Sequence, residues 1–168
     1  MPIKRIEQPK IINIDKGLRL RAFDGNYSFA AVWYNNPNTV LLVDGVFEPY
    51  SKEQLALMYD VLNKRSEVYF IEVKKENRFV PIGDVAFCKK DFNIVIGDEK
   101  YRRKGIGKKV ITSLAKRAKN IGYKKLFVRE IFDFNVASLA CFAACGFVPR
   151  KKTKKGVSFV LDLKKNQN

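Results

Sequence analysis

The stretch that decides the fold is IVIGDEKYRRKGIGKKVITSLAKRAK, residues 94–119. A short apolar run leads into a segment with two glycines and six cationic side chains between Asp98 and Ile111. Apolar residues then recur at the spacing of one helix face. Like charges one helical turn apart repel by about a few tenths of a kcal/mol, so this crowding predicts an anionic ligand.

The spacing of the glycines narrows the kind of anion site. It does not fit the G-x-x-x-x-G-K-[ST] phosphate loop, and Val110 stands where the dinucleotide fingerprint has its third glycine. What remains is Arg102, Gly105 and Gly107 in an R-x-x-G-x-G pattern between a predicted strand and a predicted helix. Glycines let bare backbone N–H groups approach a phosphate at a helix start, where unpaired donors and the dipole favour negative charge. The pattern therefore predicts a pyrophosphate site.

Composition limits the classes of protein to consider. A chain of 168 residues with 46% apolar content fits one globular domain, residues 1–168. It has no apolar run of membrane-spanning length and no signal-peptide pattern, so we expect a cytoplasmic protein without a membrane partner. The absence of histidine excludes imidazole bases and His-ligated zinc, and the three cysteines have no metal-ligand spacing, so we expect no metal.

The net charge of +16 is unevenly distributed along the chain. The basic excess lies in residues 1–21 (+4), 98–125 (+9) and 149–168 (+6), and residues 22–97 are slightly acidic. The largest excess therefore coincides with the predicted anion site.

Hydrophobic periodicity and turn residues predict the elements of the fold. In chain order they are a strand at 17–23, helices at 25–36 (ended by Pro37) and 51–64, strands at 67–73, 79–88 and 92–97, a helix at 105–120, a strand at 124–132, a helix at 135–145, and a hairpin over 147–152 and 157–163. This order predicts an α/β (α+β) fold with a mixed, mostly antiparallel sheet of about seven strands and helices on both faces.

A second segment makes the pattern specific. FDFNVASLACFAACGF, residues 132–147, follows the first segment, and together they resemble the two signature segments of the GNAT family, the GCN-related N-acetyltransferases. The resemblance is strongest over 79–148, and the predicted element order extends it to a core of about 17–163. It implies a sheet splayed between its fourth and fifth strands, with acetyl-coenzyme A (acetyl-CoA) bound as a substrate in the opening.

The resemblance also implies a set of contacts to that substrate. Backbone groups of Val95 and Ile96 would pair with the pantetheine arm, the loop from Arg102 to Lys108 would wrap the pyrophosphate, and Asn135 would bond the pantetheine beside Ser138. The remaining loop residues of this set are Arg103, Lys104, Gly105, Ile106 and Gly107. Asn135 has a second interpretation, because Asn is a favoured helix cap.

The implied reaction is direct acetyl transfer to a primary amine. A lysine-like amine is protonated at pH 7, and its deprotonation costs about 4.6 kcal/mol, so a base or a desolvating site is needed. The candidate bases are Asp91, Glu72, Asp84 and Glu130. Asp91 is the first choice because many family members carry an acidic residue at the start of that strand, although Asp is also common in turns.

The general acid departs from the family pattern. Phe142 occupies the position of the tyrosine that often protonates the leaving thiolate, and Phe has no proton to give. Tyr34, Tyr50 or water could serve instead.

The acceptor remains open between a small amine and a peptide amine. Asp44 and Glu48 would attract a cationic amine, whereas the basic hairpin at 149–156 would suit an acidic partner. Two alternatives to the enzyme are a CoA-binding family member with altered or lost catalysis and a basic nucleic-acid-binding module. The core spacing of the aromatic residues argues against the latter. A homodimer is compatible with the sequence.

Overall fold

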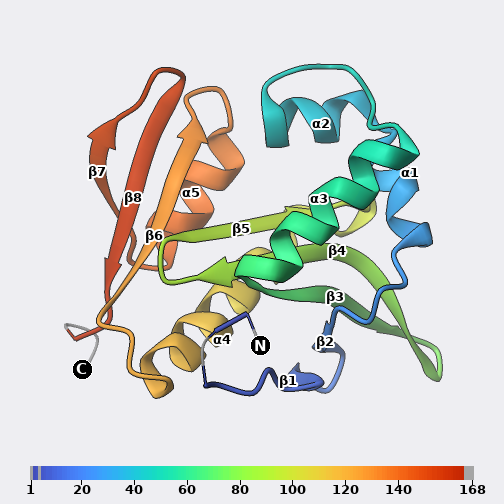
Figure 1. Ribbon diagram of the computed structural model, residues 1–168, viewed down its shortest axis with the longest axis horizontal. Coiled ribbons are helices and arrows are strands. Elements are labelled where there is room, and N and C mark those ends of the chain that lie inside the picture. Colours follow the sequence, from blue (N-terminus) through green and yellow to red (C-terminus); the bar gives the residue numbers. More distant parts are fainter. Residues whose placement is uncertain (1, 4, 165–168) are drawn as a thin grey trace. The chain divides into compact units, whose positions relative to one another are not determined.

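The computed structural model describes residues 2–3 and 5–164, which form two compact units. The first unit contains the described residues up to Ala86 together with Ile94–Arg102. The second contains Phe87–Asn93 and the chain from Arg103 onward. Figure 1 shows the elements of both. That the whole chain acts as a single domain stays a prediction.

The first unit is built on a five-stranded sheet with the order β1-β2-β3-β4-β5. Its strands are β1 (Ile11–Asp15), β2 (Leu18–Ala22), β3 (Glu67–Lys75), β4 (Arg78–Cys88) and β5 (Asp91–Ile96). The tip of the β4–β5 hairpin belongs to the second unit. The predicted meander of three strands is confirmed. The edge strand β1, which pairs with β2 in antiparallel register, was not predicted.

One predicted helix of the first unit is shorter than expected, and another element was missed. The stretch predicted as a helix at 25–36 forms only a 3-10 turn (Ser28–Ala30) and one turn of α1 (Ala31–Tyr34). Pro37 does not merely end that helix, because it opens α2 (Pro37–Asp44), which Asn36 caps by accepting from the Asn38 N–H at 2.9 Å. Proline at the first helical position costs no hydrogen bond, which explains this correction.

The core of the first unit is aromatic. The helix α3 (Lys52–Arg65) begins at Ser51 with a capping box and packs on β3 with Leu55 and Tyr59 buried. Trp33, Tyr34 and Phe70 join them in one buried cluster. The predicted helix at 51–64 is confirmed.

The second unit combines two helices with a three-stranded sheet of order β6-β8-β7. Its elements are α4 (Ile106–Asn120), β6 (Lys125–Phe132), α5 (Val136–Ala144), β7 (Val148–Lys152) and β8 (Gly156–Asp162). β8 pairs antiparallel with both neighbours. β5 and β6, the fourth and fifth predicted strands, thus lie in different sheets. The predicted fold class is confirmed, with eight strands among the described residues rather than about seven in the chain.

Candidate functional site

The start of α4 is an uncapped helix N-terminus. Gly105 is its N-cap with a left-handed φ of +75°, and no side chain caps the first turn. No acidic residue lies in that turn either, while Lys108 and Lys109 do. The exposed amide donors and the helix dipole therefore meet added positive charge, which favours an anion.

The two glycines of the loop serve different purposes. A Cβ on Gly105 would meet nothing within 4 Å, so glycine is needed there for its backbone conformation. A Cβ on Gly107 would lie 3.2 Å from Sγ of Cys141, so glycine there lets α4 approach α5 closely. Arg103 also has a positive φ of +59°, an uncommon value for a residue with a side chain.

Arg102 is held by protein contacts within the first unit. Its Nε donates to the Ile96 carbonyl at 2.8 Å, and its terminal nitrogens reach Thr39 Oγ1 at 2.8 Å and Glu99 Oε1 at 3.3 Å. This geometry makes Arg102 an anchor of the loop that follows β5. Its role as a phosphate ligand stays a prediction.

The backbone at Val95 and Ile96 is fixed by close approach of its neighbours. A Cβ on Gly83 would lie 2.1 Å from the Val95 carbonyl oxygen, and one on Gly97 would lie 2.2 Å from the Trp33 ring. Only glycine fits at either position. The end of β5, where the sequence predicted backbone pairing with pantetheine, is therefore closely packed within the first unit.

Asn135 is the N-cap of α5. Its Oδ1 accepts from the Ser138 N–H at 3.2 Å, which satisfies one orphan donor of the helix. The structure thus brings together Asn135 and Ser138, two residues that the resemblance placed at the pantetheine, in one capping motif of the second unit.

Asp91, the first-choice base, already accepts several hydrogen bonds. Its Oδ1 accepts from the Phe92 and Arg129 backbone N–H groups at 3.0 and 3.1 Å, and its Oδ2 accepts from Arg129 Nε at 2.7 Å. These donors occupy most of the lone pairs of the carboxylate. Such a geometry ties β6 to the start of β5 within the second unit.

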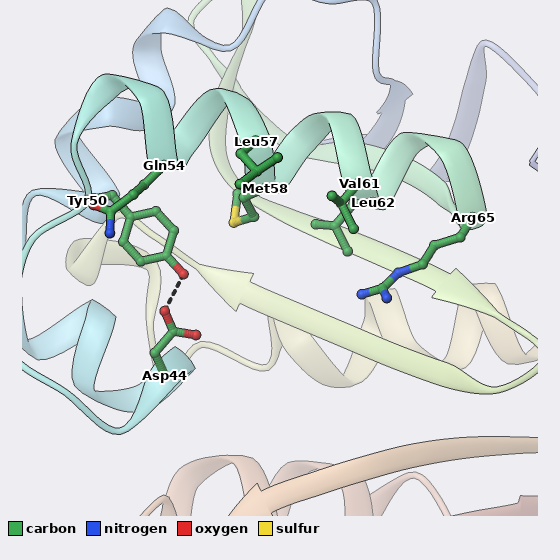
Figure 2. A pocket seen from close by; sticks show the side chains of 8 residues that line it. All are labelled: Asp44, Tyr50, Gln54, Leu57, Met58, Val61, Leu62 and Arg65. Atoms are coloured by element: carbon green, nitrogen blue, oxygen red, sulfur yellow. Dashed lines mark hydrogen bonds between the residues drawn. The ribbon is translucent and has the colours of Figure 1, made fainter.

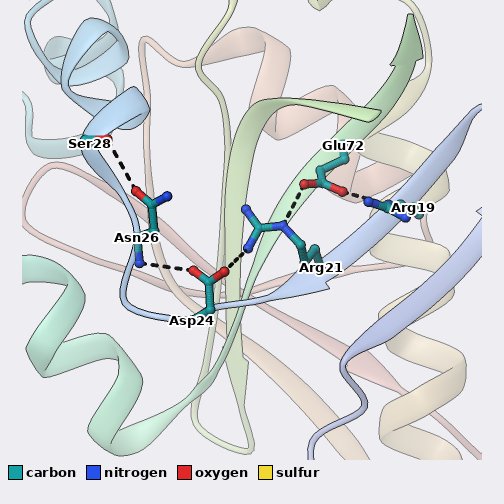
Figure 3. Close-up of polar contacts among 6 residues, drawn as sticks. All are labelled: Arg19, Arg21, Asp24, Asn26, Ser28 and Glu72. Carbon is teal, nitrogen blue, oxygen red and sulfur yellow. Dashed lines mark hydrogen bonds and ion pairs between the residues drawn. The ribbon is translucent and has the colours of Figure 1, made fainter. Parts of the chain in front are cut away.

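The carboxylate of Glu72 is also paired already, in this case with two arginines. Arg19 Nε and Arg21 Nε each donate to one of its carboxylate oxygens at 2.7 Å (Figure 3). The guanidinium of Arg19 also lies over the Phe79 ring, 4.0 Å from its centroid. Glu130, the fourth candidate, is exposed.

Asp84 differs from these carboxylates because it is buried and, among the residues that the structure describes, no cation lies at hydrogen-bond distance from it. Its Oδ2 accepts from the hydroxyls of Tyr34 at 2.9 Å and Tyr59 at 2.7 Å. Burial raises the pKa of the Asp84 carboxyl to about 6, although the two hydrogen bonds oppose that rise. The same burial, together with the charge of Asp84, raises the pKa of both tyrosines. Asp84 therefore loses its proton at a higher pH than an ordinary aspartate does.

Asp84 was predicted from the sequence as a candidate base, but its partner Tyr59, which lies 25 residues away, was not predicted to be part of the site. A single carboxylate inside the apolar run IGDVAF was the available signal, because a buried charge needs partners.

Phe142 lies in an aromatic cluster of the second unit. It is 2% exposed and makes edge contacts with Phe92 and Phe147 at ring-centroid distances of 5.8 and 5.1 Å. The aromatic ring at this position therefore packs the core around α5.

Two half-buried cysteines lie on α5 and at its C-cap. A hydrogen bond from Cys141 lowers the pKa of the Cys145 thiol to about 7 and raises that of Cys141. Among the residues that the structure describes, no group of three or more potential His, Cys, Asp or Glu ligands gathers to hold a metal. Nor does any helix in this part of the chain have the length and apolar character that crossing a bilayer requires.

Solved structures share this fold. A domain from Methanocaldococcus jannaschii superposes with a TM-score of 0.78 at 22% identity, covering 86% of this chain and 97% of that one. Spermidine N-acetyltransferase from Vibrio cholerae, solved with CoA and spermine, gives 0.72 at 19% identity, covering 92% and 100%.

Sequence comparison gives the family. An uncharacterised protein of Methanocaldococcus jannaschii is 29% identical over 161 residues, which is 92% of this chain. The chain spans only about a third (32%) of the length of that curated relative. The family model of the acetyltransferase (GNAT) family matches residues 30–147, well over half of the chain. The chain belongs to the GNAT acetyltransferase family.

Proposed function

We propose that this chain is an acetyl-CoA-dependent N-acetyltransferase that moves an acetyl group from the thioester to a primary amine by direct attack. The observation that carries the proposal is the uncapped, lysine-flanked N-terminus of α4 in a chain of the GNAT family. The Vibrio cholerae structure, which contains CoA and spermine, supports both a CoA donor and an amine acceptor for this fold.

The phosphates of the donor would be held by the segment from Arg103 to Lys108. Amide groups of Gly105, Ile106 and Gly107 would donate to the pyrophosphate, and Lys104 and Lys108 would balance its charge. Val95 and Ile96 would offer backbone groups to the pantetheine arm, and Asn135 with Ser138 would lie near it. Arg102 would act as the anchor of the loop through Ile96 and Thr39.

The amine attacks the thioester carbonyl carbon, the C–S bond breaks, and the thiolate leaves while the amine loses a proton. We assign that proton to Asp84, because its raised pKa and its two tyrosine partners suit a base better than the arginine-paired geometry of Asp91 does. Tyr34 and Tyr59 hold the Asp84 carboxylate in place. A thiol of pKa about 8.5 leaves as thiolate at a cost of about 2 kcal/mol at pH 7, so water suffices where Phe142 cannot donate.

The test is release of free thiol from acetyl-CoA in the presence of an amine panel, combined with the shift in melting temperature that acetyl-CoA causes. We expect both a rise in melting temperature and thiol release with at least one amine. A rise without thiol release across the panel would support the cofactor-binding member without catalysis. No rise, together with salt-dependent binding of an oligonucleotide, would support the nucleic-acid-binding alternative instead. Assembly as a homodimer stays a prediction.

A further inference from the structure

A groove runs along α3 in the first unit. It has a volume of about 320 Å³, and all the residues that line it belong to that unit (Figure 2). We call it the α3 groove; its lining includes Asp44 and Tyr50 at one end, Leu57 and Val61 along the middle, and Arg65 at the other end. The lining residues on α3 recur every three or four positions, so they form one continuous stripe of the helix.

The middle of the α3 groove exposes apolar side chains. Leu57 is 62% exposed and Val61 is 39% exposed, although both lie on a helix whose opposite side fills the core of the unit. Adjacent exposed aliphatic residues that also line a hollow mark a surface that a ligand can cover. The body of the ligand should therefore be apolar.

The two ends of the α3 groove carry opposite charges. Asp44 accepts a hydrogen bond from the Tyr50 hydroxyl at one end, as Figure 2 shows, and the Arg65 guanidinium lies at the other. Among the described residues Arg65 has no ion-pair partner, whereas its neighbour Lys64 pairs with Asp60 at 2.7 Å. A complementary ligand carries a cation at the Asp44 end and an anion at the Arg65 end.

The length of the groove sets the size of the ligand. Gln54 and Arg65 are 11 positions apart on α3, which corresponds to about 16 Å along the helix axis. An extended peptide advances about 3.3 Å per residue, so about five residues span that distance. A free amino acid is too short, and a polyamine would place a cation against Arg65.

The Asp44 end also adjoins the proposed base. The Tyr50 ring stacks on the Tyr34 ring with centroids 5.0 Å apart, and the Tyr34 hydroxyl donates to Asp84. The Tyr34–Tyr50 pair thus connects the Asp44 end of the groove to the Asp84 carboxylate.

We propose that the α3 groove is the acceptor subsite for an extended peptide. The N-terminal amine of the peptide binds at Asp44 and Tyr50, its aliphatic residues cover Leu57 and Val61, and an acidic side chain about four positions later pairs with Arg65. This proposal rests on the proposed acetyltransferase function, and it names a peptide amine rather than a polyamine as the acceptor.

The experiment compares two peptide amides, Ala-Leu-Val-Leu-Glu and Ala-Leu-Val-Leu-Lys, as acceptors with acetyl-CoA, reading kcat/KM from thiol release. We expect the wild-type protein to prefer the Glu peptide at least 10-fold, and Arg65→Glu to reverse that preference. Asp44→Asn should raise KM about 10-fold for both peptides. Lys64→Ala, which alters the neighbouring cation on the same helix, should change neither.

Anisotropy of the same peptides, labelled at the C-terminus, provides a readout that does not require turnover. Arg65-dependent binding without thiol release from either peptide or from the amine panel would overturn the proposed function and leave a peptide-binding groove. Thiol release with amines, but equal use of both peptides by the wild-type protein and Arg65→Glu, would overturn the groove proposal and leave the function intact.

Discussion

The two units of the molecule differ sharply in charge. The second unit carries 19 lysines and arginines against four acidic residues, a formal charge of +15, whereas the first carries 14 against 13 and is nearly neutral. The carboxylate with the raised pKa, Asp84, is buried in the nearly neutral unit, and the uncapped helix start lies in the basic one. Under the proposed function, the first unit would accept the proton of the amine and the second would bind the anionic donor.

The largest effect should come from replacing the proposed base in the first unit. Asp84→Asn keeps the size of the side chain and an acceptor for the tyrosine hydroxyls, but it removes the base, so we expect kcat to fall about 100- to 1,000-fold. Asp91→Asn, in the basic unit, is the matched variant and should lower kcat less than 10-fold while reducing stability through the loss of its Arg129 pair. Steady-state kinetics of both variants distinguish the two candidate bases. A larger loss of kcat in Asp91→Asn would return the role of base to Asp91.

The Asp84 carboxylate should also make the free energy of unfolding depend on pH. The folded-state pKa of Asp84 is raised to about 6 from an ordinary value of 3.8, so the folded state binds the proton more tightly than the unfolded state. Its contribution to the free energy of unfolding is then present below about pH 4 and is lost as the pH rises to about 6, a change of about 3 kcal/mol.

Denaturant unfolding of the wild-type protein and Asp84→Asn at pH 4, 5, 6 and 7 measures this contribution. We expect the stability of the wild type relative to the variant to decline across that range. A difference that does not vary with pH would show that Asp84 is not perturbed.

On the anion side, Gly105→Ala tests the start of α4. A Cβ at a φ of +75° strains the backbone by about 1 kcal/mol and disturbs the amides that we assign to the pyrophosphate, so acetyl-CoA should bind about 10- to 30-fold more weakly. Gly122→Ala, with a φ of +91° and equally open space around its Cβ position, should cost similar stability without changing affinity. Calorimetric titration measures the affinity of both variants for acetyl-CoA. An equal loss of affinity in the two would contradict the assignment of the amides at the start of α4 to the pyrophosphate.

The smallest effect should come from a single lysine. Lys108→Ala removes one cation next to the start of α4, so we expect about a 3-fold loss in acetyl-CoA affinity and a weaker dependence of that affinity on salt. Lys116→Ala, in the middle of the same helix, serves as the control. The binding constant of each variant for acetyl-CoA is measured at several salt concentrations. An identical dependence on salt in the two variants would show that the phosphates do not bind next to Lys108.

Most of the framework could be predicted from the sequence because its signals are local. The apolar stripe of α4, the Ser51 cap of α3 and the turns between β3, β4 and β5 each lie within a few consecutive residues. The helix α2 was missed because Pro37 was taken as an end rather than as a first helical position. β1 was missed because apolar and polar residues do not alternate throughout IINID, where Ile11 and Ile12 are adjacent, although the burial of the strand does alternate.

Only the part of the candidate site with a local sequence signal was predictable. The loop at Gly105 follows from its spacing, whereas the Asp84 cluster joins residues 25 and 50 positions apart, and only the packing of α1 and α3 brings them together. No local pattern distinguishes the hydrogen-bonded Asp84 from Asp91, whose partner Arg129 lies 38 positions away.

Nitrogen-15 NMR of the protein during titration with acetyl-CoA is the most direct test of the central claim, that the start of α4 binds the diphosphate. We predict that the amides of Gly105, Ile106 and Gly107 shift strongly and saturate together, while the Gly122 amide stays unchanged. Saturable binding that leaves the amides of residues 105–107 unmoved would contradict the account.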